Sequence, residues 1–207
     1  MKKVLLAMLA LLSITASAKS NVDPKYMAGA VPEENGMVVF RKSFRVPGKG
    51  QEDILARMRD FVTGELMAPA IQDLRTRLLS DGKDSGVIAA RVEEWMVFKK
   101  KPAYLDRTRF RYLFTAKVTG DKVDMEISQI SYYYGEQTDG TKGESYKAEE
   151  WITDREAINK AGTRLYPRSG KFRIKTIDRA GEIFAKAIEK FEERRMVEVR
   201  SGVVVSE

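Results

Sequence analysis

The sequence predicts an α+β fold in which an antiparallel β-sheet is packed by helices on one face. Several segments alternate apolar and polar residues with a period of two, and two others repeat apolar residues every three or four positions. The chain has 207 residues, which is enough for one ordinary domain with a buried core. Hydrophobic residues make up 43% and charged residues 32%, and this apolar content argues against a disordered chain.

Cysteine and histidine are both absent from the sequence. Their absence excludes disulfides, zinc sites of the Cys/His kind and every Ser-His or Cys-His mechanism. The sequence also lacks a P-loop, a dinucleotide-binding glycine motif and a calcium-loop spacing of acidic residues. We therefore expect no cofactor and no metal site.

The first 18 residues have the pattern of a signal peptide. Lys2 and Lys3 precede an uncharged stretch over 4–18, which ends in the small residues Ala16 and Ala18. A short buried helix or a membrane anchor is the alternative, but this stretch is short for a span of about 20 residues. We expect an exported protein, periplasmic or secreted, with no transmembrane segment after cleavage. It is not a lipoprotein, because no cysteine is present to carry the lipid.

The remaining chain is predicted to form one α+β domain with short extensions. The predicted parts are an extended N-terminal arm (19–36), a single domain (37–195) and a C-terminal tail (196–207). Within the domain, 37–134 forms the sheet-bearing part and 144–195 a helical extension packed on it.

The first predicted elements follow from the spacing of apolar residues, which changes from every second position to every third or fourth. Residues 37–46 alternate as a strand and end at Pro47. Residues 51–67 form an amphipathic helix, which Pro69 ends or kinks. Residues 68–80 remain ambiguous: we prefer a hairpin with a strand over 87–98, and a longer kinked helix through Leu79 is the rival interpretation.

The clearest hairpin joins residues 105–118 to 123–134 through a turn at Gly120 and Asp121. This turn places Val118 opposite Val123. The same register pairs apolar residues on one face and polar or oppositely charged residues on the other, namely Ala116 with Met125, Phe114 with Ile127, Lys117 with Asp124 and Thr115 with Glu126.

The C-terminal part is predicted to be mainly helical. Thr153 and Glu156 have the spacing of a capping box, which starts a short helix over 154–162. A loop over 166–170 and a brief strand over 171–175 follow. A long helix over 176–195 has one apolar stripe formed by Ile177, Ala180, Phe184, Ile188 and Phe191.

Three strings of residues resemble a known family. They are Asp106-Arg107-Thr108-Arg109 within 38–134, then the run over 149–154 and the run over 170–178. The stretch over 38–134 resembles domain of unknown function 4468, a family with a TBP-like fold, and the later runs are similar to segments that follow this domain in exported bacterial members.

The resemblance implies a compact sheet packed by helices, an exported protein and no catalytic residues. The sequence departs from the family pattern at Gly50, where a hydroxyl cap is expected, and around 68–70. A TBP-like fold does not by itself bring nucleic-acid binding. Export and the interspersed signs of charge lead us to expect no nucleic-acid partner.

The hairpin register also predicts a candidate ligand surface. If Phe110 faces the core, Arg107, Arg109 and Arg111 face outward, and Tyr134 and Tyr132 lie opposite Arg107 and Arg109. Such a basic, aromatic stripe on an open sheet face suits an anionic envelope polymer or a protein partner with carboxylates. A solvated face with arginine stems over the rings is the plainer interpretation, and a bulge between Arg107 and Tyr112 would turn part of the stripe inward.

Two adjacent carboxylate pairs are the enzymatic candidates, Glu93 with Glu94 and Glu149 with Glu150. Paired carboxylates suit glycoside hydrolysis, but adjacent residues on a strand point to opposite faces, so neither pair forms a dyad by itself. We therefore assign no catalytic residue. The sequence favours a non-enzymatic binding or interaction module of the cell envelope, and a carboxylate-dependent envelope hydrolase is the alternative.

Overall fold

The computed structural model describes residues 22–68, 75–102, 104–136 and 141–200. The predicted leader over 1–18 lies outside the described residues. Within them, no helix is both long enough and apolar enough to cross a membrane.

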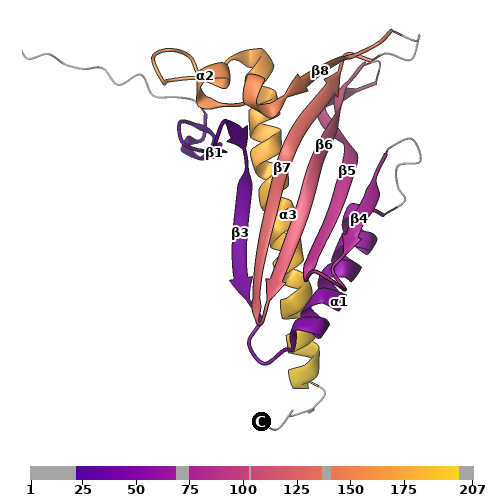
Figure 1. Cartoon of the computed structure of the whole chain (residues 1–207). Coiled ribbons are helices and arrows are strands. Elements are labelled where there is room, and N and C mark those ends of the chain that lie inside the picture. Colours follow the sequence, from indigo (N-terminus) through magenta and orange to yellow (C-terminus); the bar gives the residue numbers. More distant parts are fainter. Residues whose placement is uncertain (1–21, 69–74, 103, 137–140, 201–207) are drawn as a thin grey trace, which may run out of the picture.

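A six-stranded antiparallel sheet forms the centre of the fold (Figure 1). Its strand order is β3-β7-β6-β5-β4, with β8 pairing beyond β3 on the same edge of β7. The strands of this sheet are β3 (Phe40–Arg45), β4 (Arg77–Asp81), β5 (Val87–Lys101), β6 (Tyr104–Thr119), β7 (Lys122–Tyr134) and β8 (Glu144–Lys147). A small separate hairpin is formed by β1 (Glu33–Glu34) and β2 (Met37–Val38).

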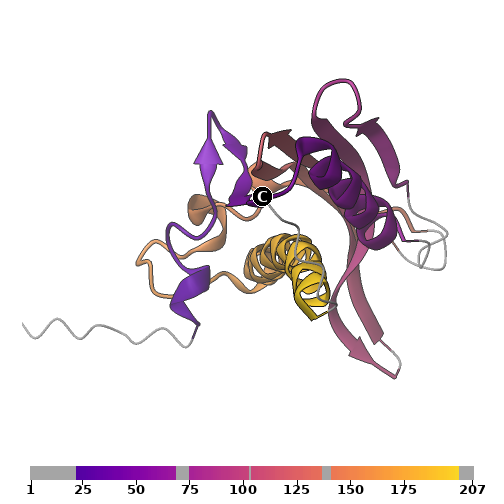
Figure 2. The same ribbon diagram turned by 90° about the horizontal axis from the view of Figure 1, so that it is seen from below.

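Two helices cover one face of the sheet, which we call the inner face. They are α1 (Gln51–Phe61), extended by the π-helical turn η2 (Val62–Leu66), and α3 (Pro167–Arg200). Apolar side chains of both helices join one core with the inner-facing residues of β5, β6 and β7. Figure 2 shows the sheet curving around α3, and in Figure 1 α3 runs behind β5, β6 and β7. The predicted α+β fold with helices on one face is confirmed.

Several local predictions are confirmed as well. The strand over 37–46 corresponds to β2 and β3, and the helix over 51–67 to α1 with η2. The ambiguous segment ends in β4, which pairs with β5 as a hairpin, so the rival helix through Leu79 is wrong.

Other predictions in the C-terminal part are wrong. Residues 167–170 of the predicted loop and the whole predicted strand over 171–175 are part of α3, which begins at Pro167. Proline suits the first position of a helix, because its fixed φ is already helical and its missing N–H has no partner there. The buried residues Phe172 and Thr176 lie one turn apart and extend the apolar stripe towards the N-terminus of the helix.

The predicted capping box is also wrong. The Thr153 side chain makes no capping hydrogen bond and instead donates to the Glu149 carbonyl. The helix that follows, α2 (Asp154–Ala157), is shorter than expected, because Ile158 leaves it and forms a bridge with Leu165. Two short 3-10 turns complete the fold, η1 (Pro24–Tyr26) and η3 (Ala148–Glu150).

The N-terminal arm is docked on the body by a buried arginine of α3. The Arg173 side chain is fully buried and donates to the carbonyls of Tyr26, Met27 and Ile152 at 2.6 to 2.7 Å. It also forms an ion pair with Asp154 at 2.6 Å. One guanidinium thus joins the arm, the segment before α2 and α3.

Candidate functional site

The hairpin of β6 and β7 has the predicted register near its turn and a different register further along. Val118 lies opposite Val123 and Phe114 opposite Ile127, as predicted. A bulge follows in β7, and beyond it Arg111 lies opposite Ser131. Gln129, inside the bulge, has a φ of 51°, a conformation that residues other than glycine seldom adopt. The bulge adds one residue to β7. Each residue of β7 beyond the bulge therefore lies on the opposite face of the sheet from the one predicted.

This exchange makes the prediction for the two tyrosines wrong. Tyr132 and Tyr134 point to the inner face, not to the arginines. The Tyr132 ring is fully buried against Phe110, and its hydroxyl lies 2.7 Å from Thr176 Oγ1. Burial raises the pKa of the Tyr132 hydroxyl. The Tyr134 hydroxyl donates to Asp106 at 2.9 Å.

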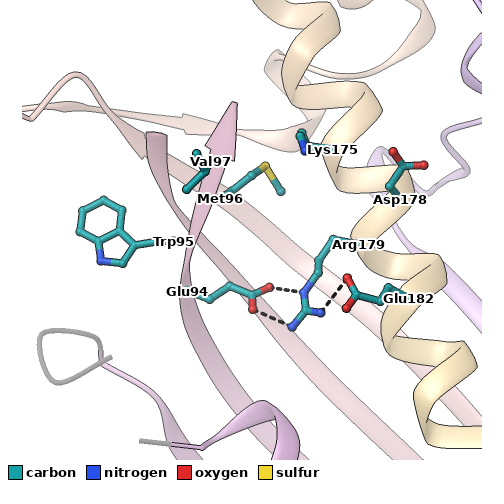
Figure 3. Close-up of a pocket in the computed structure, with 8 residues that line it drawn as sticks. All are labelled: Glu94, Trp95, Met96, Val97, Lys175, Asp178, Arg179 and Glu182. Carbon is teal, nitrogen blue, oxygen red and sulfur yellow. Dashed lines mark hydrogen bonds and ion pairs between the residues drawn. The ribbon is translucent and has the colours of Figure 1, made fainter. Parts of the chain in front are cut away.

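The three predicted arginines do lie together on the outer face, beside two aromatic rings. The Arg107 guanidinium carbon lies 3.6 Å from the Trp95 ring centroid, and that of Arg109 lies 4.8 Å from it. The Arg111 guanidinium carbon lies 5.4 Å from the ring centroid of Tyr133. We call Arg107, Arg109 and Arg111 the arginine ladder. Figure 3 shows Trp95 directed away from the sheet face that packs on α3.

Two carboxylates pair with part of the ladder. Glu93 has a side chain only 3% exposed, and it accepts from Arg111 at 2.9 Å with Arg109 at 3.8 Å. Arg109 also pairs with Glu136 at 2.9 Å. Among the described residues Arg107 has no ion pair. The charge of the ladder is therefore compensated at Arg109 and Arg111 and left open at Arg107.

A pocket lies beside the ladder. Residues directly opposite one another across four strands form one row, Glu93, Arg111, Ser131 and Lys147. Ser131 and Lys147 line a pocket of about 460 Å³, together with Gln129 of the bulge and Met37. The row therefore leads from the arginines to a concavity lined by one cation, Lys147, and two carboxylates, Glu149 and Glu150.

A second cleft, of about 310 Å³, lies on the inner side between β5 and α3 (Figure 3). Arg179 makes two hydrogen bonds of 2.8 Å to the Glu94 carboxylate and an ion pair of 3.0 Å with Glu182. Burial lowers the pKa of Arg179, but Glu94 outweighs it and raises that pKa overall. Burial acts to raise the pKa of Glu182, and the neighbouring Arg179 and Lys186 lower it overall. Glu94, Arg179 and Glu182 thus satisfy one another's charges in this cleft and fasten α3 to β5.

A buried hydroxyl lies close to this group. Tyr112 is almost completely buried, and its hydroxyl makes no hydrogen bond of normal geometry. Burial raises the pKa of Tyr112, and the nearby Glu94 carboxylate raises it further. Tyr112 is therefore a neutral side chain on the inner face, beside the ion pair of Glu94 and Arg179.

The carboxylates of the hydrolase alternative all have structural partners. Glu93 and Glu94 lie on opposite faces of β5 and bind different arginines. Glu149 accepts from the Val38 backbone at 2.8 Å, and Glu150 from the Lys147 backbone at 3.4 Å. The described part of the chain holds no group of three or more acidic side chains that could bind a metal ion.

Sequence reasoning missed three members of the outer surface, Glu93, Trp95 and Tyr133. The signal for the first two is their spacing in β5, since residues two apart on a strand share a face. For Tyr133 the signal is a phase change in β7, where apolar residues at 123, 125 and 127 continue at 130, 132 and 134.

Comparisons with known proteins agree with this architecture. The family described as a domain of unknown function (DUF4468) with TBP-like fold matches residues 40–133. A crystal structure of a DUF4468 family protein from Bacteroides ovatus is 38% identical, with a TM-score of 0.70, and the match covers 81% of this chain and 93% of that one. The chain belongs to the DUF4468 family.

A more distant structure extends the comparison of fold. A TBP-like protein from Parabacteroides distasonis is 18% identical to this DUF4468 protein, with a TM-score of 0.64, over 78% of this chain and 97% of that one. At this identity the likeness concerns the fold alone. No curated protein matches the chain.

Proposed function

We propose that this DUF4468 protein is a non-enzymatic binding module of the cell envelope that holds an anionic polymer on its outer sheet face. The observation that carries the proposal is the position of Arg107. Its guanidinium is stacked 3.6 Å from the Trp95 ring centroid and, among the described residues, has no carboxylate partner. Its charge is therefore oriented in advance and available to a ligand.

The rest of the ladder supports binding along a line. Side chains two positions apart on one strand lie about 6.5–7 Å apart, so the three guanidiniums can meet successive groups of an extended ligand. A guanidinium donates two parallel hydrogen bonds to a carboxylate or a phosphate. A polymer of acidic sugars presents carboxylates at regular intervals and so suits this row.

The location in the envelope rests on the predicted leader. Residues 1–18 have a basic start, an uncharged stretch and small residues at the expected cleavage site. An exported protein meets polymers of acidic sugars and phosphates outside the cytoplasm, which is where the proposed ligand class occurs.

The test compares two single substitutions on the same strand. Arg107→Gln removes the stacked, unpaired charge, and Lys117→Gln removes an exposed charge of β6 ten residues away. Polygalacturonate is the probe, dextran is the uncharged control, and titration calorimetry measures binding. We expect Arg107→Gln to weaken polygalacturonate binding about fivefold to tenfold, and Lys117→Gln to change it less than about twofold.

Two further variants sharpen the result. Replacing Arg107, Arg109 and Arg111 together by alanine should abolish binding in a protein that retains its circular dichroism spectrum. Glu93→Gln should tighten binding, because it frees Arg111 from its partner. Unchanged affinity in the triple variant, or equal losses in Arg107→Gln and Lys117→Gln, would overturn the proposal.

A further inference from the structure

The free end of the β5 and β6 hairpin carries an unusual surface. Three of the six large apolar side chains that are most exposed in the described chain lie here: Val97 (40%), Tyr104 (55%) and Leu105 (46%). Figure 2 shows this end of the hairpin, in magenta, projecting beyond α3. Apolar side chains at a projecting end are costly in water unless they contact something else.

Three lysines accompany these apolar residues. Lys99, Lys100 and Lys101 are consecutive and exposed, and none of them has an ion pair with another described residue. The nearest acidic residue along the strand, Asp106, is already bound to Lys171 at 2.6 Å and to the Tyr134 hydroxyl. The hairpin end therefore carries three uncompensated positive charges.

The opposite end of the same sheet is built differently. There, Arg45 pairs with Asp121 at 2.5 Å, and Lys122 pairs with Asp124 at 2.7 Å. No large apolar side chain is prominently exposed at that turn among the described residues. Exposed lysines next to exposed apolar residues are thus a feature of one end and not of this sheet in general.

We propose that the end of the β5 and β6 hairpin, formed by Lys99, Lys100, Lys101, Tyr104 and Leu105, binds the surface of a bilayer that contains anionic phospholipids. Each lysine near such a surface gains attraction to the lipid phosphates. Tyrosine favours the headgroup level, and leucine enters the hydrocarbon boundary. A soluble polyanion would use the lysines and leave the two apolar side chains in water, so this combination favours a lipid surface.

The experiment measures cosedimentation of the exported chain, from residue 19 onward, with phosphatidylcholine vesicles, with and without phosphatidylglycerol. We expect binding to the mixed vesicles and little to phosphatidylcholine alone. Replacing Lys99, Lys100 and Lys101 by glutamine should weaken binding about tenfold or more. The matched control replaces Lys42, Lys117 and Lys160, three exposed lysines elsewhere, and should change binding less than about threefold.

A second measurement tests the apolar part. Tyr104→Trp places an indole at the hairpin end, and its emission should shift to shorter wavelength on mixed vesicles. Leu105→Ser should weaken vesicle binding at both low and high salt, because it removes apolar contact and no charge.

Two outcomes would overturn the inference. Equal losses for the two lysine triples would show only a general charge effect, and an unshifted Tyr104→Trp emission on bound protein would show that the hairpin end stays in water. The inference is independent of the arginine ladder: Arg107→Gln tests polygalacturonate binding, whereas the hairpin variants test vesicle binding. Either proposal can fail while the other holds.

Discussion

The two faces of the sheet use charge for different purposes, and two adjacent residues of β5 show the difference. Glu94 points to the inner face and binds Arg179 of α3, which is 85 residues away in the chain. Glu93 points to the outer face and binds Arg111 of the neighbouring strand. The inner-face pair therefore fastens a helix to the sheet. The outer-face pairs around the arginine ladder hold arginines in place between neighbouring parts of the sheet.

The strongest test of this contrast is Arg173, which is buried and joins three segments on the inner side. Arg173→Met keeps much of the side-chain volume but leaves the carbonyls of Tyr26, Met27 and Ile152 without their donor. We expect it to lower the free energy of unfolding by about 3–5 kcal/mol. Urea unfolding followed by circular dichroism measures the change.

The control for this substitution is Arg164→Met, at an exposed arginine, which should change stability by less than about 0.5 kcal/mol. Limited proteolysis should also cut the N-terminal arm of Arg173→Met faster than that of the unaltered protein. If the free energy of unfolding fell by less than about 1 kcal/mol, this would contradict the inference that Arg173 holds the N-terminal arm on the body.

The sequence predicted the sheet and α1 well because their periodic patterns are local. It did not predict the start of α3, because the run from Lys171 to Lys175 alternates like a strand. That run is helical because Phe172 and Arg173 are buried against other segments, and two of the partners, Tyr26 and Met27, are more than 100 residues away. A pattern within five residues contains no information about such partners.

The candidate surface was predicted in part, and its error has a single cause. Arg107, Arg109 and Arg111 face outward as the alternation of β6 requires. The tyrosines were placed on the wrong face because one constant register was assumed for the whole hairpin. The bulge at Gln129 changes that register, and its local signal is the three-residue step from Ile127 to Ile130 in an otherwise alternating strand.

The next test compares Glu94→Gln with Glu93→Gln. Glu94→Gln should lower the free energy of unfolding by about 1–3 kcal/mol, because Arg179 is mostly buried and loses a bidentate partner. Glu93→Gln should cost less, within about 1 kcal/mol, because the glutamine oxygen can still accept from the Arg75 backbone N–H, Arg111 reaches solvent and Arg109 keeps Glu136. Urea unfolding measures both, and the reverse order would show that the two faces do not differ as described.

The smallest expected effect concerns the bulge that sets which tyrosine joins the outer face. Gln129 has a φ of 51°, which glycine adopts without steric cost, and its side chain accepts one exposed hydrogen bond from Arg91. Gln129→Gly should therefore raise the free energy of unfolding by up to about 1 kcal/mol. Gln129→Val should lower it by about 1–2 kcal/mol, since a β-branched residue resists positive φ. If the two variants had equal stability, Gln129 would not hold the strained conformation, and the position of Tyr133 beside Arg111 would lose its explanation.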